Sequence, residues 1–253
     1  MQYGSQELLF EYRDRFLPES MRRKTYIDDE KPKEKLALPK DFRLLATSST
    51  RDPDVLAIKK YLYFDRGLTE DDLWFYKIGY SNQMKWLRRA IFPSFDKDGE
   101  LNYYVGRTID KKARPKYETP EGDRHHVIFN EINLDWSKQI VLCEGVFDMV
   151  KCGENAVPLL GSDLSQDSTL FNAIVANKTP VALAMDADMK VKKTPKIAQK
   201  LMDYNIDVVI VNVATDPGDM TKKDFKAALK EAQPFDWHQT FLDRLNHASR
   251  ISL

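Results

Sequence analysis

The sequence contains few of the residues that build disulfide frameworks and zinc sites. Its only two cysteines are Cys143 and Cys152, which excludes a disulfide framework and a four-cysteine zinc ribbon. Cys143 lies in an apolar run, where a thiol acts as a small buried hydrophobe. The four histidines show no zinc-ligand spacing, so we expect no zinc in this chain. Any bound metal should therefore be a hard cation, Mg²⁺ or Mn²⁺, held by carboxylates.

Long apolar runs and a charge excess are also missing. No apolar run approaches the ~20 residues that a membrane span needs, so we expect no membrane contact. Residues 1–16 lack the basic start and apolar core of a secretory signal, which favours a cytoplasmic protein. Lys+Arg 39 and Asp+Glu 39 cancel, so the net charge does not by itself indicate a polyanionic partner.

The first half of the chain mixes helix and strand patterns. Residues 51–68 predict a helix that begins at Asp54, and residues 69–78 predict a short helix capped by Thr69. Residues 89–96 and 100–109 alternate as the two strands of a hairpin. We expect a charged arm over residues 1–48, a smaller mixed α+β subdomain over 49–135, a second domain over 136–234, and a C-terminal helix over 235–253 that either packs on the core or docks a partner.

From residue 138 onward, apolar strands alternate with helices. Because these strands are apolar throughout, they predict a mainly parallel sheet that is flanked by helices on both faces, which is an α/β fold. The expected strands are 140–144, 156–161, 180–188 and 206–213, and the expected helices are 146–153, 167–178, 194–205 and 220–233.

Acidic residues follow most of these strands. The carboxyl ends of parallel strands meet at one edge of a sheet, so the acids should lie together, and like charges held close favour a bound cation. The residues concerned are Glu144, Asp186, Asp188, Asp216 and Asp219. The alternative is that each acid only caps the next helix or turn, as Asp216-Pro217-Gly218 alone would suggest. Two acids in Asp186-x-Asp188 are hard to explain as capping, and Gly145 is expected to let the chain turn sharply beside the metal.

The acidic motifs resemble those of the TOPRIM domain, which DnaG-type primases, topoisomerases and some nucleases share. EGVFD (144–148), DAD (186–188) and DPGD (216–219) match in order and in strand context. Upstream, RGLTEDDLWFYKIGYS (66–81), RAIFPSFDKDGELNYYVGRTI (89–109) and PKY (115–117) resemble bacterial and phage primases of the DnaG type. The resemblance covers roughly residues 50–230 and implies a primase catalytic core with a TOPRIM-type sheet.

The resemblance implies roles for individual residues. Glu144, Asp186 and Asp188 would be catalytic and metal-binding. Asp148, Asp216 and Asp219 would be supporting metal ligands. Template or nucleotide contacts would come from Arg89, Arg107 and Lys116. The alternative interpretation is that these three are ordinary exposed charges on strands and loops. After DAD the family often has an Ala-Gly pair, and this chain departs from that pattern with Lys190 and Lys192, which would either meet triphosphates or form a solvated loop.

The implied activity is metal-dependent, template-directed synthesis of short RNA primers on single-stranded DNA from nucleoside triphosphates (NTPs), in the bacterial cytoplasm or that of a phage's host. The family's zinc-binding and helicase-binding modules are missing from this sequence. The zinc-binding module either lies on another chain or has been removed from a longer protein. A replicative helicase or a separate zinc-binding module is an expected partner. Two alternatives stay open: a Mg²⁺-dependent nuclease of the TOPRIM type, and a non-catalytic nucleic-acid-binding subunit of a split primase.

Overall fold

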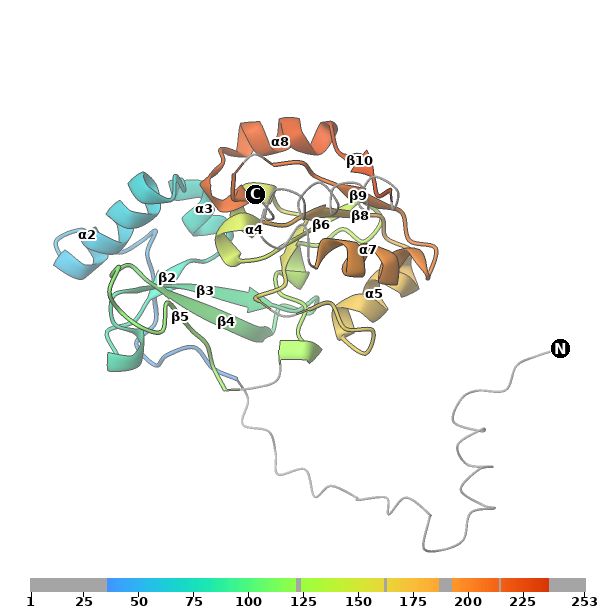
Figure 1. Cartoon of the computed structure of the whole chain (residues 1–253). Coiled ribbons are helices and arrows are strands. Elements are labelled where there is room, and N and C mark those ends of the chain that lie inside the picture. Colours follow the sequence, from blue (N-terminus) through green and yellow to red (C-terminus); the bar gives the residue numbers. More distant parts are fainter. Residues whose placement is uncertain (1–35, 122–123, 162, 187–192, 214, 237–253) are drawn as a thin grey trace, which may run out of the picture. The chain divides into compact units, whose positions relative to one another are not determined.

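The computed structural model describes residues 36–121, 124–161, 163–186, 193–213 and 215–236. The described residues from Leu36 onward belong to one compact unit. Most of the expected N-terminal arm and the C-terminal helix lie outside the described residues. Within the described part, six α-helices accompany two five-stranded sheets (Figure 1).

The first sheet is antiparallel and contains the predicted hairpin. Its central strands pair in register from Arg89 opposite Thr108 to Ser94 opposite Tyr103. At the turn between them, the Asp96 carboxylate accepts hydrogen bonds from the backbone N–H groups of Asp98 and Glu100. In spatial order the strands are β1 (Arg43–Leu44), β2 (Gly79–Tyr80), β3 (Arg89–Phe95), β4 (Leu101–Thr108) and β5 (Tyr117–Glu118).

Two helices precede the hairpin. The first, α2 (Pro53–Lys60), is capped by Asp52, whose carboxylate accepts from the N–H groups of Asp54 and Val55. The predicted start at Asp54 was therefore wrong, because proline is accepted at the first helical position and the cap lies before it. The chain continues as a short π-helix, η1 (Tyr61–Asp65). The second helix, α3 (Glu70–Phe75), begins at the predicted cap, Thr69, which forms a capping box with Asp72.

The second sheet has the predicted parallel core. Strands β7, β6, β8 and β9 pair in parallel, and β10 adds an antiparallel edge. The edge strand was missed, because residues up to 233 were assigned to a helix, whereas Gln233 pairs with Ile210. The strands are β6 (Ile140–Cys143), β7 (Ala156–Pro158), β8 (Val181–Ala184), β9 (Val208–Ile210) and β10 (Gln233–Pro234).

Helices cover both faces of this sheet. Val141 and Cys143 of β6 enter one hydrophobic core with α4 and α8, while Ile140 and Leu142 enter the other with α5 and α7. The core that contains α4 also contains Phe92 of β3, so it includes residues on both sides of the predicted boundary at 135. The helices are α4 (Val146–Cys152), α5 (Thr169–Asn177), α7 (Thr194–Met202) and α8 (Lys222–Lys230). No helix among the described residues is long and apolar enough to cross a membrane.

Candidate metal centre

Three acids meet at the carboxyl ends of the parallel strands. Asp148 lies on α4 after β6, Asp186 follows β8, and Asp216 lies beyond β9. One carboxylate oxygen from each lies within 4.8 Å of the others. Asp148 is buried, Asp186 is half-buried and Asp216 is exposed, so the cluster opens to solvent on one side. Carboxylate oxygens at this spacing could bind a hard metal ion.

Asp148 serves the helix and the cluster at the same time. Its Oδ2 accepts a hydrogen bond of 2.7 Å from the Gly145 N–H, which caps the first turn of α4. Its Oδ1 faces Gly218, where an added Cβ would lie 2.6 Å from that oxygen. Gly145 itself has an extended backbone (φ −135°), which any residue can adopt, so the expected sharp turn does not explain it. The glycine that the geometry requires is Gly218.

The cluster makes the charged form of Asp148 costly. The pKa of Asp148 is raised from 3.8 to about 8, first by burial, then by the hydrogen bond and charge of Asp216, with a smaller contribution from Asp186. The Gly145 N–H acts in the opposite direction. Crowded carboxylates must hold either a proton or a cation. The site is therefore suited to a divalent cation that displaces this proton.

Glu144 is not part of the group of three acids, but it lines the same pocket as they do. Its Oε2 is buried and has no hydrogen-bond partner within the described residues. A buried carboxylate oxygen without a partner is costly, and a bound cation would satisfy it. The residues present therefore fit a hard divalent metal ion.

The structure groups the predicted acids differently from their predicted ranking. Asp148 and Asp216, expected as supporting ligands, meet Asp186. Asp219 lies outside the group and accepts a hydrogen bond of 3.1 Å from Arg66 Nη1. Asp188 lies outside the described residues. The sequence does mark Asp148, which is the only acid in α4 and lies between two apolar residues, Phe147 and Met149, that the structure buries.

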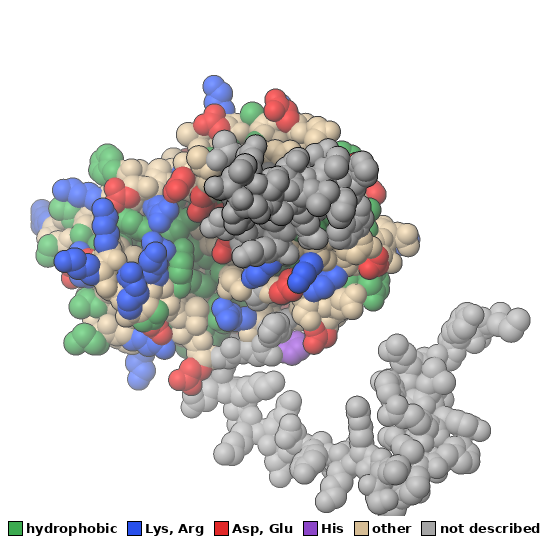
Figure 2. All heavy atoms as spheres, viewed as in Figure 1, with side chains coloured by type: hydrophobic (Ala, Val, Ile, Leu, Met, Phe, Trp, Pro, Cys, Tyr) green, Lys and Arg blue, Asp and Glu red, His purple; other side chains and the backbone are tan. Residues whose placement is uncertain are grey.

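The three clustered acids and Glu144 line an open pocket of roughly 450 Å³ that basic side chains also line. The Arg107 guanidinium lies over the Tyr117 ring, 4.8 Å from its centroid. On the face shown in Figure 2, Lys and Arg side chains gather over the antiparallel sheet. Four basic residues line the pocket, namely Arg66, Arg107, Lys116 and Arg124. Arg66 was not among the predicted site residues, although it begins the RGL stretch on which the resemblance rested.

Arg89 occupies a different position from the other predicted basic residues. It is only 7% exposed, and its guanidinium donates to the backbone carbonyls of Lys85, Gly106, Pro115 and Lys116. These bonds tie the segment that carries Lys116 to β3 and favour a structural role. Template contact by Arg89 stays a prediction. Lys190 and Lys192 lie outside the described residues.

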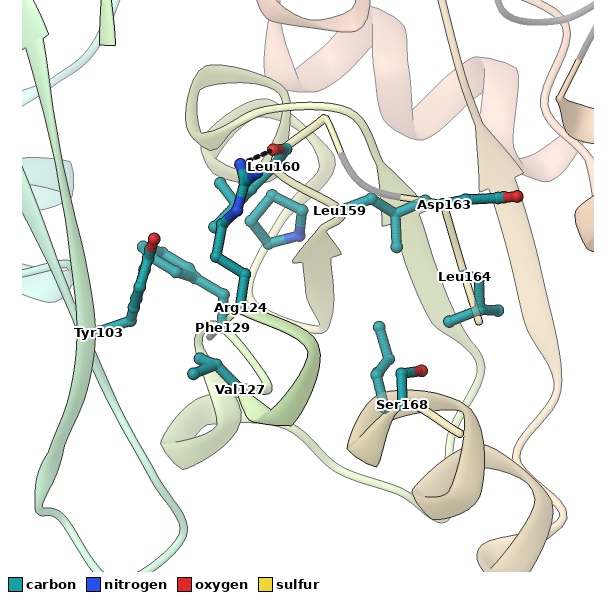
Figure 3. A pocket seen from close by; sticks show the side chains of 11 residues that line it. Tyr103, Arg124, Val127, Phe129, Leu159, Leu160, Asp163, Leu164 and Ser168 are labelled. Carbon is teal, nitrogen blue, oxygen red and sulfur yellow. Dashed lines mark hydrogen bonds between the residues drawn. The ribbon is translucent and has the colours of Figure 1, made fainter. Parts of the chain in front are cut away.

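A second, smaller cavity adjoins the acidic pocket and shares Arg124 and Leu160 with it (Figure 3). Arg124 Nη1 donates a hydrogen bond of 3.0 Å to the Leu160 carbonyl. The cavity measures about 30 Å³, which accommodates a water molecule and not a nucleotide. This second cavity is therefore too small to be a substrate site.

Comparison with known proteins finds DNA primases that are similar to this chain. No protein-family model matches the chain. A DNA primase from Listeria innocua serovar 6a is 26% identical over 159 residues, which are 56% of this chain and 25% of that protein. The chain thus spans about a quarter of that relative's length.

Solved structures extend the likeness to the fold. The Escherichia coli primase catalytic core superposes with a TM-score of 0.60 at 18% identity, covering 78% of this chain and 79% of that one. A DnaG primase catalytic domain bound to single-stranded DNA superposes with a TM-score of 0.59 at 18% identity, covering 74% of each chain. The predicted resemblance to a DnaG-type primase core is confirmed, and the chain has that fold.

Proposed function

We propose that this chain is the catalytic core of a DnaG-type DNA primase. It would be a DNA-directed RNA polymerase that synthesises short RNA primers from NTPs on single-stranded DNA, with a TOPRIM-type sheet. The observation that carries this proposal is the cluster of Asp148, Asp186 and Asp216 in a pocket that basic residues also line. The fold and the curated relative's name support it.

The acids would hold Mg²⁺ or Mn²⁺. Asp148, Asp186 and Asp216 are the candidate ligands, Glu144 has an oxygen available for a cation, and Asp188 follows in sequence. When bound, divalent metal supplies charge neutralisation for the triphosphate and acidifies the attacking 3′-hydroxyl. Nucleotidyl transfer depends mainly on positioning and charge stabilisation, so no separate protein base is needed.

Basic residues that line the pocket would hold the polyanionic substrates. Arg107 and Lys116 line the pocket, where they can attract triphosphate and template phosphates. Tyr117 is 41% exposed and has the Arg107 guanidinium over its ring, an arrangement that suits base stacking on the ring's other face. A replicative helicase or a zinc-binding module on another chain would complete the system in the cytoplasm.

The direct test separates the chemistry from initiation. A short RNA annealed to a DNA template is supplied with labelled NTPs and Mg²⁺ or Mn²⁺, so that extension of the RNA does not depend on the unknown initiation sequence. We expect extension by the wild type and by Asp163→Asn, because Asp163 lies outside the acidic cluster and pairs with Lys200. We expect none from Asp186→Asn.

Other outcomes identify the alternatives. Metal-dependent degradation of the DNA without synthesis would favour a nuclease that uses the same acids. DNA binding without either reaction would favour a non-catalytic subunit.

A further inference from the structure

The loop between η1 and α3 is docked on the elements that carry the acidic cluster. Arg66 Nη1 donates to Asp219 Oδ1 at 3.1 Å, and the Gly67 carbonyl accepts a hydrogen bond of 2.7 Å from Lys151 Nζ on α4. Leu68 is 4% exposed and belongs to the same hydrophobic core as Phe147 of α4. Three consecutive residues thus contact the acid-bearing half of the fold.

The Arg66 side chain is held from several sides. Its Nε donates a hydrogen bond of 2.9 Å to the Tyr61 hydroxyl. Its guanidinium carbon lies 4.7 Å from the centroid of the Phe147 ring, and Phe147 directly precedes Asp148. Because its orientation is fixed by these contacts, the guanidinium is preorganised to receive Asp219.

Asp219 belongs to the turn that presents Asp216. This turn, η5 (Pro217–Asp219), is capped by Asp216, whose Oδ1 accepts a hydrogen bond of 2.8 Å from the Gly218 N–H. The Asp219 N–H in turn donates to the Asp216 carbonyl at 2.9 Å. Gly218 packs directly against the Asp148 carboxylate. Fixing Asp219 therefore fixes the turn on which Asp216 reaches Asp148.

We propose that Arg66 is a positioning residue of the metal centre: its ion pair with Asp219 holds η5 so that Asp216 stays within reach of Asp148 and Asp186. This inference rests on the proposed metal-dependent function. Arg66 acts through Asp219 and the turn, and contacts none of the three clustered carboxylates through a hydrogen bond recorded among the described residues. The ion pair links the helical segment before the antiparallel sheet to the ends of the parallel strands.

The direction in which removal of the Arg66 guanidinium changes metal affinity distinguishes a positioning role from a purely electrostatic one. A guanidinium near an acidic site opposes the binding of a cation, so its removal should strengthen metal binding if charge alone mattered. If Asp219 were itself a ligand, Arg66 would compete with the metal, and its removal would again strengthen binding. Positioning predicts the opposite result, because the turn that carries Asp216 loses its support.

The experiment measures Mn²⁺ binding by the whole chain, using the electron paramagnetic resonance signal of free Mn²⁺. We expect Arg66→Gln and Asp219→Asn each to weaken binding by roughly 10-fold, the scale seen when groups that orient metal ligands are removed. The double variant should be no worse than either single variant, because both remove the same contact. Asp110→Asn is the matched control: it breaks the Arg88–Asp110 ion pair, whose Nε–Oδ2 distance is 2.9 Å, away from the pocket, and should leave Mn²⁺ binding unchanged.

The outcomes distinguish this inference from the proposed function. Absence of Mn²⁺ binding by the wild type would overturn the metal centre itself. Binding by the wild type with equal or tighter binding by Arg66→Gln would overturn the positioning role alone. Circular dichroism checks folding, and if Arg66→Gln does not fold, Arg66→Lys replaces it. Lysine keeps the charge and lacks the planar fork, so we expect weaker binding than in the wild type, and unchanged binding would overturn the inference.

Discussion

Gly218 lies where a side chain has no room. A Cβ at this position would lie 2.6 Å from Asp148 Oδ1 and 3.2 Å from Asp216 Oδ1. In Gly218→Ala the turn or the carboxylates must therefore move, with a strain of roughly 1–3 kcal/mol. We expect Mn²⁺ affinity to fall by roughly 10-fold or more, measured by titration, and RNA extension to fall with it.

Gly145→Ala is the control for this substitution. Its nearest contact would be Asp148 Oδ2 at 3.5 Å, an ordinary van der Waals distance, and its backbone suits alanine. The loss of a preferred cap residue costs only about 1 kcal/mol, so Mn²⁺ affinity should stay close to that of the wild type. Equal metal loss in both variants would contradict the steric explanation.

The raised pKa of Asp148 predicts how metal-free stability depends on pH. Between 3.8 and about 8 the folded state keeps the Asp148 proton, whereas the unfolded chain has released it. The folded state therefore binds more protons, and the free energy of unfolding should decrease as pH rises through this window. Thermal unfolding in EDTA from about pH 5 to about pH 9 measures this decrease.

Asp148→Asn and added metal test the cause of that decrease. Asparagine can still cap α4 but has no proton to release, so the variant should lose the part of the pH dependence that Asp148 supplies. Metal binding requires deprotonated carboxylates, so stabilisation by Mn²⁺ should increase with pH over the same window. An unchanged pH profile in Asp148→Asn would assign the effect to other groups.

At the scale of elements, the sequence predicted the features that depend on residues close together in the chain. Thr69 caps α3 as expected, because a threonine followed three residues later by an acid forms a capping box. The apolar run of β6 predicted a strand buried on both faces, and its residues alternate between two cores. Strand β10 was missed because its two residues carry no strand pattern of their own and pair only through the fold.

The composition of the acidic cluster depended on strand register, which a single sequence does not contain. Cys143 pairs with Ala184, so Glu144 is level with the residue before Asp186. Asp148 returns toward the strand ends after one helical turn and is held there by the Gly145 N–H. The rule that the carboxyl ends of parallel strands meet at one edge therefore predicted where the acidic cluster lies. Which acids join Asp186 there depends on strand pairing and on the packing of η5 against α4.

Lys151 provides a test of the contact between α4 and the loop at Gly67. It is 5% exposed, and its ammonium group donates to the Gly67 carbonyl. Lys151→Met keeps the apolar stem and leaves that carbonyl without this donor, so we expect a loss of roughly 1–3 kcal/mol in the free energy of unfolding. Denaturant titration measures it, and exposed Lys226→Met on α8 should change stability by less than about 0.5 kcal/mol. Equal losses would show that the buried contact contributes nothing specific.

At the scale of the whole molecule, a net charge of +0 conceals a separation of charge. Four basic residues line the same pocket as the acids, so a polyanion can bind there although the total charge cancels. Composition alone could not predict this, because it does not record which charges share a surface. If the chain binds nucleic acid as proposed, this binding should weaken measurably with salt.

Lys116 is exposed and lines the pocket, so it should contact phosphate if single-stranded DNA binds at the pocket. Each phosphate contact on single strands contributes a slope of about −0.7 to the logarithm of affinity against the logarithm of salt concentration. In Lys116→Gln we expect weaker binding at low salt and a slope shallower by roughly this amount, for all sequences alike. Fluorescence anisotropy of a labelled oligonucleotide from about 50 to about 200 mM salt measures both. Lys97→Gln, in the exposed hairpin turn where Lys97 pairs with Asp98, should keep the wild-type slope, and a slope unchanged in Lys116→Gln would place the DNA elsewhere.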